Sequence, residues 1–189
     1  MTNPDQMLAA VASSLQQRTG KSLQQWVDLV EQSAIDPLNQ NEVRRWLKQQ
    51  HGIAQNSQWA IADAAARAAG WQPPTLEEYI SQQYAGAKAP LLVIFQHLRQ
   101  RIMTLGADVQ IEGRASYIPF IRKRQFTAIA AATKNRVDVG LRFTDAPQSH
   151  LLQAANGPGQ ATHKISLTDV EQVSDEVETL LVAAYQQNG

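Results

Sequence analysis

The chain has 189 residues and a mass of 20.9 kDa, enough for one full domain or two small ones. Seventeen Lys and Arg residues balance seventeen Asp and Glu residues, which argues against a uniformly basic nucleic-acid binder and against a strongly acidic protein. Apolar residues make up 43% of the chain, too many for intrinsic disorder. The absence of cysteine excludes disulfides, thiolate nucleophiles and Cys-ligated zinc sites.

The sequence predicts a cytoplasmic protein with no membrane partner. Residues 1–18 contain neither the basic segment nor the small-residue cleavage pattern of a signal peptide. The longest apolar stretch, residues 89–95, is far shorter than the roughly 20 residues that a membrane-spanning helix needs.

Residues 1–70 are predicted to form a small domain of four helices. Ser22 and Gln25 form the pattern of a capping box at the start of the second helix. Gly52 and Gly70 stand where glycine commonly ends a helix, after the third and fourth apolar stripes. The apolar stripe of the first helix consists of Leu8, Val11, Ala12 and Leu15.

The composition changes after this domain. Pro73-Pro74 and Gly86 mark residues 71–89 as a junction, which we expect to pack as a linker. Within it, Thr75 followed by two glutamates predicts the start of a short helix over residues 75–83.

Residues 90–189 predict an α+β domain, with about five antiparallel strands and helices covering one face of the sheet. A long amphipathic helix ends near Gly106, after which the apolar period changes from 3.6 to 2. Residues 145–159 predict a long loop. The chain closes with a helix whose apolar stripe consists of Val177, Leu180, Leu181 and Ala184. The predicted strands are residues 109–113, 117–121, 126–133, 137–143 and 163–167.

No catalytic, cofactor or metal motif is apparent. Gly20-Lys21-Ser22 lacks the upstream glycine and strand of a phosphate-binding loop, and a helix N-cap at Ser22 explains the same residues. The four histidines fall in four different predicted elements, so their spacing predicts no metal site. We therefore expect no catalytic residues, no cofactor and no metal.

Charge is divided within the second half of the chain. Nine basic and three acidic residues lie between Arg99 and Arg142, whereas one lysine and six acids follow from Phe143 onward. Clustered cations beside aromatic rings are typical of surfaces that bind nucleic acid or another anion. The expected anion contacts are Arg122, Lys123, Arg124, Lys134, Arg136 and Arg142, with Tyr117 as a stacking residue.

Two interpretations of these cations are open. They form a ligand-facing patch, or they pair internally with Asp138 and with the acids of the terminal helix. The leading hypothesis is a non-enzymatic binding or interaction module. One alternative is a small-molecule-binding protein or enzyme with a pocket between sheet and helices near Tyr117, His163 and Tyr185. Another is a structural homodimer.

Each half of the chain also resembles a known protein domain at particular residues. Residues 19–23 with Trp26, then 46–48 and 51–53, resemble a small bacterial helical domain of unknown function. The second half is similar to another domain of unknown function that often follows the first. Its matching residues are the basic run with Gln125-Phe126, Thr133-Lys134, residues 136–141, His163 and residues 183–185.

This resemblance implies several expectations about the second domain. Some members carry the label of predicted transport protein, and others are fused to restriction-type nuclease domains, which implies a nucleic-acid context. The domain is also similar to an α+β superfamily that includes a frataxin-like iron chaperone. Iron binding of that kind implies an acidic ridge, for which the terminal helix offers Asp175, Glu176 and Glu178.

Overall fold

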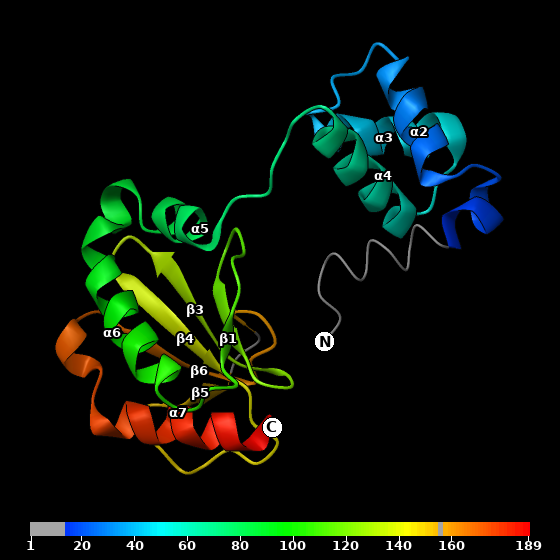
Figure 1. Cartoon of the computed structure of the whole chain (residues 1–189). Helices are drawn as coiled ribbons and strands as arrows, with labels where there is room; N and C mark the ends of the chain where they lie inside the picture. Colours follow the sequence, from blue (N-terminus) through cyan, green and yellow to red (C-terminus); the bar gives the residue numbers. More distant parts are fainter. Residues whose placement is uncertain (1–13, 155–156) are drawn as a thin grey trace. The chain divides into compact units, whose positions relative to one another are not determined.

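The computed structural model describes residues 14–154 and 157–189. The chain divides between Pro73 and Pro74 into two compact units, which we call the helical unit and the sheet unit and describe separately. The helical unit contains a helical segment over residues 14–19, then α2 (Leu23–Glu31), α3 (Gln40–His51) and α4 (Gln55–Ala68) (Figure 1). The predicted stripe residues Leu8, Val11 and Ala12 lie outside the described residues.

Local signals set the ends of these helices. The predicted capping box is confirmed: the Ser22 Oγ accepts the N–H of Gln25 at 3.2 Å, and the Gln25 Oε1 accepts the N–H of Ser22 at 2.8 Å. Gly52 ends α3 with φ 63°, a conformation that glycine adopts without steric cost. The three helices pack around a core that includes Leu15, Trp26, Val30, Val43, Leu47 and Ile61.

In the described part of the sheet unit, three helices precede the strands along the chain and two follow them. They are α5 (Leu76–Gln83), the 3₁₀ helix η1 (Gly86–Leu91), α6 (Leu92–Met103), the 3₁₀ helix η2 (Val170–Gln172) and α7 (Asp175–Gln187). Thr75 and Glu78 form a capping box at the start of α5, and its hydrogen bonds lower the pKa of the Glu78 carboxyl. Ile80 and Tyr84, in and just after α5, are buried in the core of the unit.

Among the described residues, the sheet is antiparallel throughout and has six strands in the order β1-β2-β3-β4-β6-β5. The strands are β1 (Gln110–Ile111), β2 (Ile118–Ile121), β3 (Gln125–Thr133), β4 (Arg136–Leu141), β5 (Gln153–Ala154) and β6 (His163–Leu167). The expected number of about five was therefore slightly low. The additional strand, β5, lies inside the predicted loop and has only two residues, which is too short to show a periodicity of 2.

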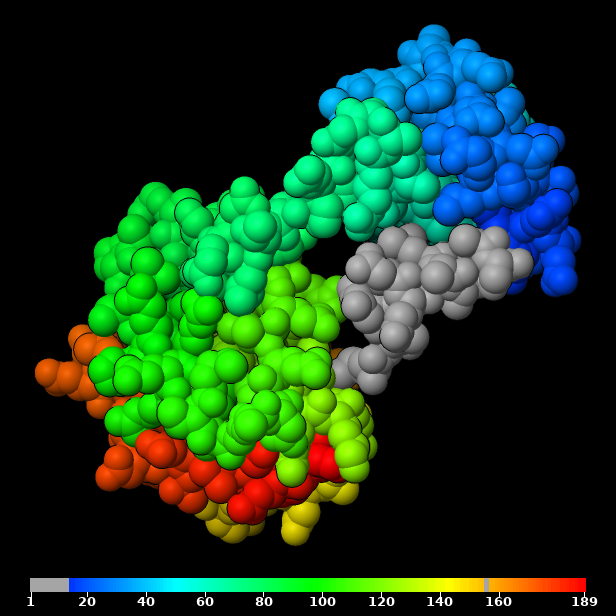
Figure 2. All heavy atoms as spheres, viewed as in Figure 1, coloured from blue at the N-terminus to red at the C-terminus, as the bar shows by residue number. Residues whose placement is uncertain are grey.

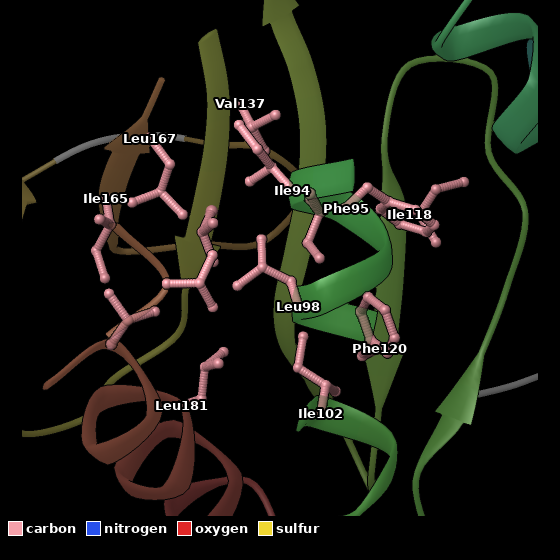
Figure 3. Packing of buried hydrophobic residues seen from close by; sticks show 14 of the residues in the cluster. Ile94, Phe95, Leu98, Ile102, Ile118, Phe120, Val137, Ile165, Leu167 and Leu181 are labelled. Carbon is pink, nitrogen blue, oxygen red and sulfur yellow. The ribbon is translucent and has the colours of Figure 1, made fainter. Parts of the chain in front are cut away.

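Both long helices cover the same face of the sheet. Figure 3 shows Ile94, Leu98 and Ile102 of α6 beside Val137, Ile165 and Leu167 of the strands, with Leu181 of α7 reaching the same cluster. Register explains the alignment, because Ile129, Val139 and Ile165 are paired across β3, β4 and β6 and therefore share one face. The predicted stripe of the last helix is confirmed, since all four of its residues are buried. The α+β architecture is likewise confirmed.

The opposite face of the sheet carries small and polar residues. Ala128, Ala130, Asp138 and Gly140 lie there, opposite one another in register. A Cβ atom at Gly140 would approach the carbonyl oxygen of Pro158 at 2.8 Å, so the segment after residue 157 packs directly on this glycine. Glycine is therefore required at this position for close packing.

An ion pair joins α6 to α7 at the edge of the helical layer. The Arg101 guanidinium lies 2.6 Å from the Glu178 carboxylate, and the space-filling view shows α7, in red, beside green atoms of the α6 region (Figure 2). Across residues 14–154 and 157–189, none of the helices is both long and apolar enough to cross a membrane.

Candidate anion-binding site

The six predicted anion contacts lie at two ends of the sheet. Residues 122–124 form the turn between β2 and β3, whereas Lys134 lies in the turn between β3 and β4. These turns are separated by the length of β3, roughly 26 Å at about 3.3 Å per residue. Arg142 lies at the first end, since its N–H donates to the Phe126 carbonyl, and Arg136 starts β4 at the second. The structure therefore does not bring the six together as one patch.

At the first end, Arg122 is neutralised by a carboxylate. Its Nε lies 2.7 Å from Oδ2 of Asp108, and its guanidinium lies 4.2 Å from the ring centroid of Tyr185. The Tyr185 hydroxyl donates to Oδ1 of the same carboxylate at 2.6 Å. The Tyr185 hydroxyl first, and then Arg122, lower the pKa of Asp108, and the hydrogen bond to Asp108 raises the pKa of Tyr185.

This triad predicts an acid-sensitive contribution to stability. Because the pKa of Asp108 is lower in the folded than in the unfolded protein, its contribution is present above the unfolded pKa and is lost as the pH falls through the folded pKa. We expect Tyr185→Phe to raise the Asp108 pKa toward its ordinary value. The free energy of unfolding should then depend less steeply on pH in the acid range. An NMR titration of the Asp108 carboxyl measures this directly. Tyr117→Phe is the matched control, and an unchanged Asp108 pKa in Tyr185→Phe contradicts the assignment.

The other cations at the first end are not paired with a carboxylate in the described residues. Arg124 donates to the carbonyl oxygen of Gln187 at 3.2 Å, and Arg142 donates to the side-chain oxygen of Gln160. Lys123 is exposed, and its side chain has no ion-pair partner in the described part of the chain. This end is consequently a basic turn on which the Lys123 and Arg124 side chains are exposed.

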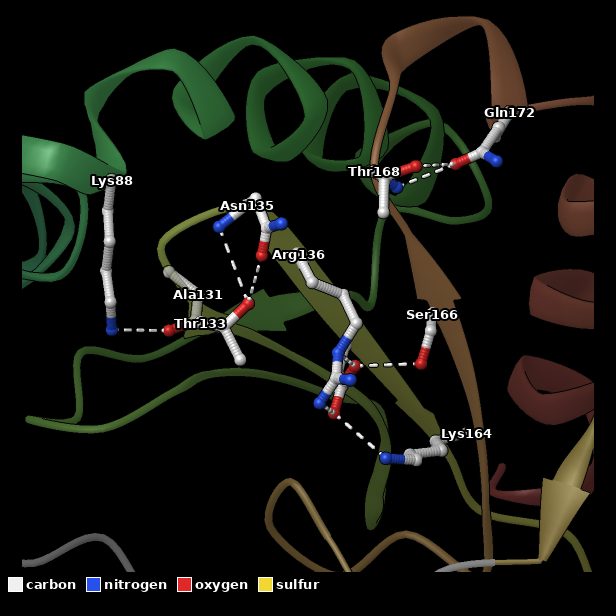
Figure 4. Close-up of polar contacts among 10 residues, drawn as sticks. Lys88, Ala131, Thr133, Asn135, Arg136, Lys164, Ser166, Thr168 and Gln172 are labelled. Atoms are coloured by element: carbon white, nitrogen blue, oxygen red, sulfur yellow. Dashed lines mark hydrogen bonds and ion pairs between the residues drawn. The ribbon is translucent and has the colours of Figure 1, made fainter.

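A buried carboxylate organises the polar face near the second end. Asp138 is only 7% exposed, and its oxygens lie 2.9 Å from Nε of Arg136 and 3.1 Å from Nζ of Lys164 (Figure 4). The Ser166 hydroxyl donates to the same carboxylate at 2.9 Å. Two cations share one carboxylate, so the cluster has an excess positive charge. Arg136 therefore takes part in an internal network, as one of the two interpretations expected.

The acids of the terminal helix pair with other residues. Asp175 and Glu178 lie 3.8 Å and 2.6 Å from the Arg101 guanidinium, and Glu176 accepts a hydrogen bond from Ser149 at 2.7 Å. No ion pair joins a carboxylate of α7 to any of the six predicted contacts in the described part of the chain. The terminal helix does not neutralise the basic residues of the sheet.

Beside the second end, the sheet unit contains a hollow of about 700 Å³, which we call the lysine hollow. Segments from four parts of the unit line it: α5, η1, the segment before β2, and the end of β3 with its turn. No carboxylate is among its lining residues. They are Gln82, Gln83, Ala85, Ala87, Lys88, Ala115, Ser116, Ala130, Ala131, Ala132 and Lys134.

The lysine hollow offers both donors and an acceptor. Nζ of Lys88 donates to the Ala131 carbonyl at 2.6 Å, which leaves two of its three N–H donors (Figure 4). Lys134 is exposed, with no ion-pair partner in the described residues. Gln83 is 8% exposed and donates from Nε2 to the Arg114 carbonyl, while its Oε1 is buried with no hydrogen-bond partner in the described part of the chain.

Sequence reasoning predicted only one charged residue of this hollow, Lys134. It missed Lys88 and Gln83, because both lie in the segment interpreted as a linker, and only folding brings Lys88 to β3 and Gln83 to Arg114. One signal was present: Lys88 is the only charged residue between Glu78 and Arg99, within an apolar and Gly-Pro-containing stretch.

The three residues expected near a pocket are dispersed. Tyr117 immediately precedes β2, next to the lysine hollow, whereas His163 begins β6 at the opposite end of the sheet and three strand spacings away. His163 is half-buried against the Phe143 ring at 5.8 Å, and Tyr185 belongs to the Asp108 triad. Within residues 14–154 and 157–189, no group of three or more His, Asp or Glu side chains could hold a metal ion.

Family models match both units of the chain. The model described as Domain of unknown function (DUF5655) matches residues 80–188, more than half of the sequence. The chain belongs to the DUF5655 family. The DUF5655 match includes the whole sheet, α6, α7 and every residue that lines the lysine hollow. A second model, Domain of unknown function (DUF4287), matches residues 8–66 in the helical unit.

These two matches confirm the predicted resemblance to two successive domains of unknown function. Searches found no matching curated protein and no matching solved structure. The frataxin-like similarity stays a prediction from the sequence.

Proposed function

We propose that the chain is a cytoplasmic, non-enzymatic binding module whose sheet unit binds a phosphorylated small molecule in the lysine hollow. The observation that carries the proposal is that Lys88 and Lys134 both line a hollow of about 700 Å³ and that no carboxylate lines it. An oxyanion there would be attracted by two cations and repelled by no lining acid.

The size and lining of the lysine hollow support a small ligand. Ligand sites commonly measure about 300–1,000 Å³ and combine apolar walls with a few polar groups. Here alanines from η1, from the segment before β2 and from β3 form the apolar wall, and Ser116 adds a hydroxyl group. The lining therefore combines cations, an apolar wall and a hydroxyl group. Such a lining suits a molecule with one charged group and a larger uncharged part.

Gln83 narrows the ligand class further. Its buried Oε1 lacks a donor, and an unpaired buried acceptor costs free energy. A ligand that carries an N–H or O–H group beside its phosphate would satisfy it once the Gln83 side chain turns so that Oε1 faces the lysine hollow. Nucleotides and sugar phosphates have both groups, so the ligand class that fits best is a phosphorylated molecule with a base or a sugar.

Isothermal titration calorimetry on the full chain tests the proposal. The probes are inorganic pyrophosphate, the four ribonucleoside monophosphates and adenosine, each at low and moderate salt. We expect saturable binding of the phosphorylated probes that weakens as salt increases, and no binding of adenosine. Adenosine binding as tight as that of its monophosphate, or no binding of any phosphorylated probe at low salt, would overturn the proposal.

A further inference from the structure

The helical unit contains two adjoining hollows with basic walls. One, of about 870 Å³, lies between α3 and the start of α4 and is lined by Arg44, Arg45 and Lys48. The other, of about 440 Å³, is lined by Arg18, Lys21 and His51. Residues 52–54, the connection between α3 and α4, form a wall of both. We call the five Lys and Arg residues of these walls the basic track.

Charge is segregated in this unit although its sum is near zero. Six basic and six acidic residues precede Gly70. Five of the basic residues line the two hollows, and the sixth, Arg67, lies 2.7 Å from Asp63. None of the five acids that the structure describes in this unit lines either hollow. Such a distribution concentrates positive potential on one surface.

The cations of α3 are arranged along the helix. Arg44 and Lys48 are one turn apart, about 6 Å along the axis, and lie on the same face. The Arg45 and Lys48 side chains are exposed, with no ion-pair partner in residues 14–154 and 157–189. Arg44 is held in place, since it donates to Asn41 at 3.2 Å and its guanidinium lies 3.6 Å from the Trp59 ring centroid.

An exposed aromatic ring accompanies the basic track. Trp59 of α4 is 48% exposed, although tryptophan usually buries most of its surface in a core. The stacked Arg44 fixes the ring beside the first hollow. Cations with a neighbouring aromatic platform are the combination that binds single-stranded nucleic acid, because the cations follow the phosphates and the rings stack on the bases.

We propose that the basic track of the helical unit binds single-stranded nucleic acid, with Arg45 and Lys48 on successive phosphates and Trp59 stacking on a base. The N–H groups at the start of α4 add to this surface, because the N-cap residue Ala54 provides no side-chain acceptor for them. The proposal does not depend on the lysine hollow, which belongs to the other unit.

Fluorescence anisotropy of the full chain with a short labelled oligothymidylate tests this proposal. We expect Arg45→Gln/Lys48→Gln to weaken binding about tenfold and to reduce the salt slope of log K by about 1.4, since each phosphate contact on a single strand contributes about 0.7. Gln49→Glu/Gln50→Glu is the matched control, because it changes the net charge equally on the same helix but outside both hollows. We expect the control to weaken binding much less.

Further variants separate the two proposals. Trp59→Ala should weaken oligothymidylate binding, whereas Lys134→Glu in the sheet unit should not. Circular dichroism verifies that each variant is folded. Four results would overturn the proposal for the basic track. They are absence of binding by the wild type, equal loss of binding in the two double variants, loss of binding confined to Lys134→Glu, and binding of a duplex of the same length as tight as that of the single strand. None of these outcomes decides whether the lysine hollow binds pyrophosphate.

Discussion

Asp138→Ala should lower the free energy of unfolding of the sheet unit by about 3 kcal/mol, the largest effect that we expect from one polar substitution. The substitution removes the carboxylate on which Arg136, Lys164 and Ser166 converge, and it leaves two cations close together without a counter-charge. Both cations are partly exposed, so water relieves some of this repulsion and keeps the loss below that of a fully buried pair.

Urea unfolding followed by two probes measures this effect. All four tryptophans precede Pro74 and all four tyrosines follow it, so tryptophan fluorescence reports the helical unit and tyrosine NMR signals report the sheet unit. Asp145→Ala removes an exposed carboxylate from the same unit and should change its stability by less than about 0.5 kcal/mol. A loss below about 1 kcal/mol for Asp138→Ala would show that the cluster is not held by this carboxylate.

Lys134→Glu should weaken binding of the phosphorylated probes at least about tenfold, or about 1.4 kcal/mol. The substitution replaces an attraction with a repulsion at the edge of the lysine hollow. Little loss of stability should accompany it, because the lysine is exposed in a turn and has no ion-pair partner in the described residues. Calorimetric titration with pyrophosphate measures the ratio of the two affinities.

Lys123→Glu is the matched control for this prediction. Lys123 is also an exposed turn lysine, but it lies at the other end of β3, roughly 26 Å away. A change in overall charge would weaken binding equally in both variants, whereas a site at the lysine hollow would be sensitive only to Lys134. Ala132→Tyr, at an exposed lining position, should also reduce binding by filling the space. Equal losses in Lys123→Glu and Lys134→Glu would contradict the assignment.

The elements that the sequence predicted well are those set by local interactions. The capping box at Ser22, the helix start at Thr75 and the glycine that ends α3 each depend on residues within a few positions of one another. The stripe of α7 is equally local, because helical period alone decides which side chains face the sheet. The two-residue strand β5 was missed because its pairing with β6 is its only structural determinant.

The candidate sites depend on long-range packing, which a linear pattern does not contain. Residues 122–142 form one basic block in sequence, but β3 separates the two turns and Asp138 holds Arg136 on the sheet face. The lysine hollow forms only when η1 places Lys88 beside the end of β3. In the helical unit, the numbers of acidic and basic residues are equal, so the net charge gives no sign that five of the basic residues line two adjoining hollows.

The most direct test of a phosphate site in the sheet unit is to map binding by amide chemical shifts during a pyrophosphate titration of the isotope-labelled full chain. The lysine hollow predicts saturable shifts at Gln83, Lys88, Ser116 and residues 130–134, with residues 122–124 unaffected. Shifts confined to residues 122–124 and Arg142, or no saturable shifts in the sheet unit, would contradict it.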